Sequence, residues 1–140
     1  MSIRANLSRV AVLAIPAALV ACNESPTHPV GCYGAVTVNV TPSFEGSGKP
    51  RFDWSPRCGI TNLTVIVLPQ GIGDPAVVWD FSASESAQIA PPVVYGHVPA
   101  GATSQSVAQP LQAGITYRVS ILSTVGGDAI GGEAQKTFVP

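Results

Sequence analysis

Short stretches of alternating apolar and polar residues follow one another along most of the chain after residue 35. In residues 35–41 three valines fall on one face of the expected strand, and in residues 50–55 Phe52 and Trp54 share a face. Successive side chains of a strand point to opposite faces, so this period of two predicts strands that bury one face. Two later stretches repeat the pattern: Val77, Trp79 and Phe81, then Ile115, Tyr117, Val119 and Ile121 in residues 115–123.

Other segments lack this alternation. Residues 63–68 are almost continuously apolar and β-branched, which predicts a central strand covered on both sides. Residues 93–96 lie between prolines, which favours a sheet edge or a loop, and residues 103–108 form a polar strand candidate. The run Gly126-Gly127-Asp128 predicts a hairpin turn, from which residues 133–138 return as the last strand.

The composition agrees with short strands joined by tight turns. The chain holds 14 Gly and 13 Pro, only 11% of its residues are charged, and no long apolar helical stretch follows residue 22. We therefore expect an all-β fold.

The N-terminus has the three parts of an export signal. Arg4 and Arg9 are followed by an apolar core over residues 10–20 and by the run Leu19-Val20-Ala21-Cys22. The apolar core is well short of the ~20 residues that span a bilayer as a helix. The run resembles the lipobox of bacterial lipoproteins, and we expect residues 1–21 to be a cleaved signal peptide.

The lipobox resemblance implies a lipid anchor on Cys22. In that family the cysteine after the cleavage site receives a diacylglycerol thioether and, in many bacteria, an N-linked acyl chain such as palmitate. Residues 22–34, with Pro26 and Pro29, then read as a lipidated tether. Asn23 is not the Asp that favours inner-membrane retention in enterobacterial relatives, so the outer membrane of the cell envelope is favoured. The alternative is an ordinary secretory signal that leaves Cys22 free or disulfide-bonded.

Loss of the signal changes the charge. Removing residues 1–21 from the 140 leaves 119 residues, which suits one domain, with eight acidic against five basic residues and a formal charge of -3. The basic residues do not cluster, which argues against nucleic acid as a partner. They are Lys49, Arg51, Arg57, Arg118 and Lys136.

Once Cys22 is assigned to lipid, Cys32 and Cys58 remain as a pair. An oxidising compartment favours a disulfide between them, with a free redox pair as the alternative. Closing a loop of this length stabilises a fold by about 3 to 4 kcal/mol in the chain-entropy model. Two cysteines without a neighbouring His or a CxxC spacing make a poor metal site.

A second resemblance rests on Trp54 and on residues 111–119. Leu111 lies six residues before Tyr117, which is similar to the tyrosine corner of fibronectin type III domains. The resemblance implies an immunoglobulin-like, fibronectin type III-like Greek-key sandwich of about seven strands in residues 35–140. It also places both Cys32 and Cys58 at one pole of the domain, and Tyr117 with its hydroxyl bonded to nearby backbone.

No catalytic constellation is evident, and we do not expect an enzyme, a metal site or a cofactor. The carboxylates lie apart, and neither histidine has a metal or catalytic context, so surface and turn roles are expected. These residues are Asp53, Asp74, Asp80, Asp128, His28 and His97.

The aromatic residues separate into core and candidate binding groups. Trp54 and Tyr117 are expected in the core. Trp79 suits the core or the surface, with the core favoured, and Tyr95 and His97 in their proline-rich loop suit either packing or contact with a ligand, so these three are the candidates for a binding surface. The first hypothesis is a lipid-anchored interaction or structural module that contacts another envelope protein. The alternative is a carbohydrate- or small-ligand-binding module, which an exposed aromatic patch would favour.

Overall fold

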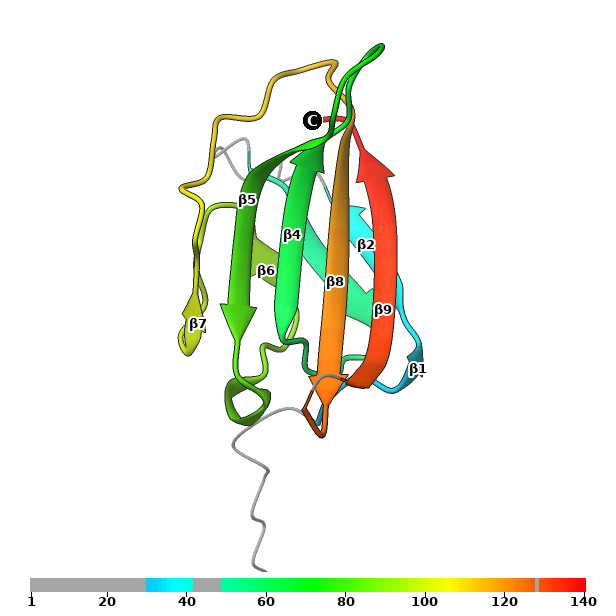
Figure 1. The fold of residues 1–140 in the computed structure, drawn as a ribbon, viewed down its shortest axis with the longest axis vertical. Coiled ribbons are helices and arrows are strands. Elements are labelled where there is room, and N and C mark those ends of the chain that lie inside the picture. Colours follow the sequence, from blue (N-terminus) through cyan, green and yellow to red (C-terminus); the bar gives the residue numbers. More distant parts are fainter. Residues whose placement is uncertain (1–29, 42–48, 128) are drawn as a thin grey trace, which may run out of the picture.

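Nine strands form two sheets in the computed structural model, which describes residues 30–41, 49–127 and 129–140 (Figure 1). The larger sheet has the order β1-β9-β8-β4-β5-β7, and its strands are β1 (Gly34–Ala35), β4 (Asn62–Val67), β5 (Ala76–Ala83), β7 (Ala102–Thr103), β8 (Tyr117–Val125) and β9 (Ala129–Phe138). The smaller sheet has the order β2-β3-β6, and its strands are β2 (Thr37–Thr41), β3 (Arg51–Ser55) and β6 (Val93–Val94). The smaller sheet lies behind the larger one in Figure 1.

The expected all-β sandwich is confirmed. Two of the nine strands, β1 and β7, are two-residue additions at the edges of the larger sheet, which accounts for the difference from about seven. All neighbouring strands are antiparallel except β1, which runs parallel to β9.

The core lies between the sheets and follows the period-two pattern. Phe52 and Trp54 of β3 belong to one buried cluster with Tyr117, Val119 and Ile121 of β8. The predicted strand over residues 115–123 is shifted by two residues, because β8 begins at Tyr117 and ends at Val125.

Strand β4 corrects the expectation of cover on both sides. It is central within its sheet, since it pairs with β5 and with β8. Only one of its faces packs in the core: Leu63 and Val65 are buried, whereas Thr64 and Ile66 are half-buried on the outer face. The apolar run therefore reflects a central position in the sheet and not a second covering layer.

A β-bulge changes the face that Val77 occupies. The register shifts between Val65 and Ile66, so that Val65 pairs with Trp79 and Ile66 pairs with Val77. A bulge inserts one residue and reverses the alternation around it. Val77 is consequently 44% exposed and Val78 is buried, in contrast to the predicted face shared by Val77 and Trp79.

The last two strands form the predicted hairpin. Gly126 and Gly127 have φ of 62° and 99°, and positive φ at both central residues suits a tight turn that glycine makes without steric cost. Strand β9 is longer than the predicted 133–138, because pairing with β8 begins at Ala129.

The exposed edge of β5 is covered by residues 102–109, most of which were expected to be a strand. Only Ala102 and Thr103 pair with β5 as a strand. Side chains take part in the next contacts: the Ser104 hydroxyl donates to the Asp80 carbonyl at 2.6 Å, and the Ser106 N–H donates to the Asp80 carboxylate at 2.9 Å. A backbone bond follows at Gln109, whose N–H donates to the carbonyl of Val78 at 3.1 Å. The edge is thus hydrogen-bonded without a continuous ladder.

The sandwich extends further toward the N-terminus than the boundary predicted at residue 35. Cys32 is fully buried, and its N–H donates to the carbonyl of Gly59. Glycines make room for this segment, since a Cβ on Gly131 would lie 2.5 Å from the carbonyl oxygen of Cys32. Residues 30–34 therefore belong to the domain and not to the tether.

Several predictions lie outside the described residues. They are the signal peptide over residues 1–21, Cys22, the tether up to residue 29 with His28, and Asp128.

Candidate functional site

Two of the three candidate binding residues, Trp79 and Tyr95, are in contact with each other, and both are buried. The rings of Trp79 and Tyr95 meet edge to face with centroids 5.3 Å apart. Trp79 is 1% exposed and Tyr95 is 4% exposed, whereas His97 is exposed. The predicted aromatic binding surface is therefore not formed by Trp79 and Tyr95, because both rings fill the space between the sheets.

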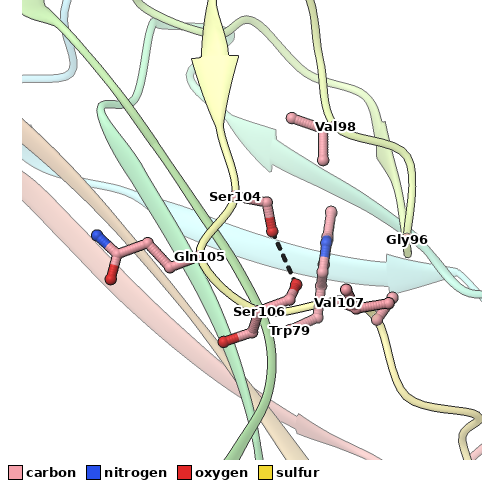
Figure 2. Close-up of a pocket in the computed structure, with 8 residues that line it drawn as sticks. Trp79, Gly96, Val98, Ser104, Gln105, Ser106 and Val107 are labelled. Atoms are coloured by element: carbon pink, nitrogen blue, oxygen red, sulfur yellow. Dashed lines mark hydrogen bonds between the residues drawn. The ribbon is translucent and has the colours of Figure 1, made fainter.

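A small surface cavity of about 260 Å³ is lined in part by Trp79 (Figure 2). Gly96, Val98 and residues 104–108 line it together with Trp79, and the Trp79 indole is seen edge-on between Ser104 and Gly96. Its polar groups already serve the fold, since the Ser104 hydroxyl donates to the carbonyls of Asp80 and Ser106. The cavity is thus a weak candidate for ligand binding.

A larger cavity of about 410 Å³ lies at the end of the sandwich where β4 and β5 are joined. We call this end the distal pole, defined by residues 68–75 and 109–116. Three glutamines line the cavity, Gln70, Gln109 and Gln112, and apolar side chains line the rest of it, including Val67 and Ile115. The sequence reasoning missed these glutamines, although each lies within two residues of a proline in a loop after or before a strand.

Two buried tyrosines hold one wall of the distal cavity. The Tyr95 hydroxyl donates to the carbonyl of Gln109 at 2.8 Å, and the Tyr117 hydroxyl accepts from the N–H of Gln112 at 3.0 Å. The bond of Tyr117 to nearby upstream backbone is the contact that the tyrosine corner predicts. Burial raises the pKa of Tyr95 to about 12, and the neighbouring Tyr117 adds to this rise. The hydrogen bond to the Gln109 backbone lowers the pKa by a smaller amount.

The two cysteines of the described domain form the expected disulfide. Cys32 and Cys58 are bonded, with Cα atoms 4.8 Å apart and a separation of 26 positions in the sequence. The Trp54 indole N–H donates to the carbonyl of Cys58 at 2.9 Å, which ties the bridge to the core. Both cysteines lie at the end opposite the distal pole, which we call the N-terminal pole, defined by residues 30–32, 56–61 and 126–127.

The carboxylates have structural partners or lie in solvent. Asp53 lies 3.8 Å from Arg57 and 3.9 Å from Arg51, and Asp80 accepts from the N–H of Ser106. Asp74 is exposed in the β4–β5 turn. Across residues 30–41, 49–127 and 129–140, no three His, Cys, Asp or Glu side chains gather into a group able to hold a metal ion.

Comparison of the chain with family models, with curated proteins and with solved structures finds no match. No helix in the described part of the chain is long and apolar enough to cross a membrane.

Proposed function

We propose that this chain is a lipid-anchored module of the bacterial cell envelope that presents a fibronectin type III-like sandwich to another envelope protein. The observation that carries the choice of a protein partner is the burial of Trp79 and Tyr95. Carbohydrate recognition by these rings would need them on the surface, whereas buried rings leave loops and sheet edges as the accessible features.

The strand order supports the fibronectin type III-like assignment. One sheet contains β2, β3 and β6, and the other contains β5, β4, β8 and β9 side by side, so that consecutive hairpins are divided between two sheets. The hydrogen bond between Gln112 and Tyr117 adds the tyrosine corner contact. Such a fold is compatible with many functions, so the partner has to be argued from the surface.

The short stretch of chain between Cys22 and the sandwich is compatible with the anchor. The carbonyl of Val30, eight residues after Cys22, accepts from the N–H of Gly59 and so already belongs to the domain. A fully extended segment of that length spans at most about 28 Å, so a lipid on Cys22 would keep the N-terminal pole near the membrane and direct the distal pole away from it. The disulfide between Cys32 and Cys58 suits an exported protein.

The anchor is tested by metabolic labelling with an alkyne analogue of palmitate, followed by mass spectrometry of the N-terminal peptide. We expect the label on Cys22 of the wild-type chain and its loss in Cys22→Ser. A Cys58→Ser variant, which loses only the disulfide, should keep the label. An unlabelled N-terminus, or cleavage elsewhere, would remove the lipid anchor from the proposal.

The partner is tested by cross-linking in intact membranes, with Cys22→Ala as the mislocalised control. A discrete protein adduct that the control loses supports the interaction module. If the protein forms no protein adduct but retains glycans in a binding assay, the carbohydrate-binding module replaces the interaction module.

A further inference from the structure

The farthest projection of the distal pole is the hairpin that joins β4 to β5, which rises above the rest of the sandwich in Figure 1. Its tip is Ile72, which lies between Gly71 and Gly73 and is fully exposed, with a relative exposure of 111%. An isoleucine in this position contributes no packing to the domain. A single exposed apolar side chain is ordinary on a protein surface, so Ile72 becomes informative only together with the cavity at the base of its hairpin.

The distal cavity lies at the base of the same hairpin. Gln70, two residues before Ile72, lines it together with Gln109 and Gln112, and no charged side chain is among the described residues that line it. Each glutamine side chain carries both a donor and an acceptor. Carboxamides above an apolar floor complement a neutral chain of peptide groups with small apolar side chains, whereas an ionic ligand would find no opposite charge.

The wall that carries two of these glutamines is held in place. Tyr95 bonds to Gln109 and Tyr117 bonds to Gln112, so the backbone of this segment is fixed at both ends by buried hydroxyl groups. The glutamine residues themselves are exposed. A site whose backbone is fixed before binding loses less conformational freedom when it binds.

We propose that the distal cavity and the Ile72 hairpin together form a docking site for an uncharged, extended polypeptide segment of the partner protein. The glutamine carboxamides pair with its backbone, an apolar side chain enters the cavity, and Ile72 packs against the partner's surface. This inference rests on the proposed function as an interaction module, and it adds the surface used and the chemistry of the partner.

The test is selection of a phage-displayed library of random peptides on the full-length protein held in lipid nanodiscs. We expect the enriched peptides to be poor in charged residues. Their affinity should fall at least tenfold in Ile72→Ser and in Gln112→Glu, which puts a carboxylate into the neutral cavity. Ile130→Ser is the matched control, because Ile130 is also exposed, at 62%, but lies on β9 near the N-terminal pole. Its affinity should not change.

Three results would overturn the inference: no enrichment over empty nanodiscs, peptides that bind Ile72→Ser as well as wild type, or peptides selected mainly for charge. Binding of wild type and of the same variants to a glycan array is measured in parallel. Glycan binding that Gln112→Glu abolishes would assign the cavity to carbohydrate. Circular dichroism confirms that each variant is folded. Labelling of Cys22 in the same preparations shows separately whether the anchor has failed.

Discussion

The hydroxyl oxygen of Tyr117 lies 3.0 Å from the backbone nitrogen of Gln112 and accepts its hydrogen bond. This contact fixes the loop that enters β8 and one end of the distal cavity wall. In Tyr117→Phe the ring still fills its place in the core, but the N–H of Gln112 loses its partner. We expect a loss of about 1 to 2 kcal/mol in the free energy of unfolding, measured by urea denaturation. Tyr33→Phe, at a residue 64% exposed, should have no effect, and equal losses would contradict this role.

Tyr95 predicts a dependence on alkaline pH. Its pKa is raised from 10.0 to about 12 in the folded state, so the unfolded chain loses the phenolic proton first. The folded state therefore binds more protons between these two values, and stability falls as the pH rises through that window. Denaturation midpoints should decline less steeply in Tyr95→Phe than in wild type. Parallel slopes would show that Tyr95 is not the group responsible.

The bulge in β5 predicts opposite sensitivities for two adjacent valines. Val78→Ala removes buried methyl groups and should cost about 1 to 3 kcal/mol, whereas Val77→Ala, at an exposed residue, should cost little. Thermal denaturation of the two variants measures the difference. A larger loss of stability in Val77→Ala than in Val78→Ala would contradict the position of the bulge.

The glycines of β9 predict a steric effect on the N-terminal segment. A Cβ at Gly131 would lie 2.5 Å from the carbonyl oxygen of Cys32, so Gly131→Ala should displace this segment and cost about 1 to 3 kcal/mol. Gly71→Ala is the control, because a Cβ there has no described neighbour within 4 Å. Amide exchange at Cys32 should accelerate only in Gly131→Ala. Unchanged exchange at Cys32 would show that the added methyl group does not displace the N-terminal segment.

Reduction of the disulfide should lower the free energy of unfolding by about 3 to 4 kcal/mol, because a closed loop between Cys32 and Cys58 restricts the unfolded chain. Guanidinium denaturation with and without a reductant measures this. The double variant Cys32→Ala, Cys58→Ala should lie at or below the reduced protein and should not respond to reductant. A wild type that is equally stable in both conditions would contradict the estimate.

Local pattern was enough to predict much of the sandwich. Alternation identified Phe52 and Trp54 as core residues, and the spacing of Leu111 and Tyr117 indicated the corner contact. Cysteine number and the expected compartment were enough to pair Cys32 with Cys58.

Features that depend on distant residues were not predictable in this way. The proline-rich surroundings of Tyr95 left packing and ligand contact both open. The choice depends on its hydroxyl bond to Gln109 and on the packing of its ring on Trp79, neither of which is near it in sequence. The bulge at Val78 arises from pairing with β4, which the alternation within β5 does not report. The distal cavity likewise forms only when residues 68–70 and 109–115 come together.

The disulfide also determines how the domain carries mechanical load. Residues 33–57, which contain β1, β2 and β3, lie inside the loop that the disulfide closes. Tension applied to the chain before Cys32 therefore passes through the disulfide bond to Cys58 and does not stretch this loop. The load then enters β4, which runs from the N-terminal pole to the distal pole between β5 and β8. Tension between the two poles is thus directed along β4, where the hydrogen bonds to both neighbours resist it together in shear.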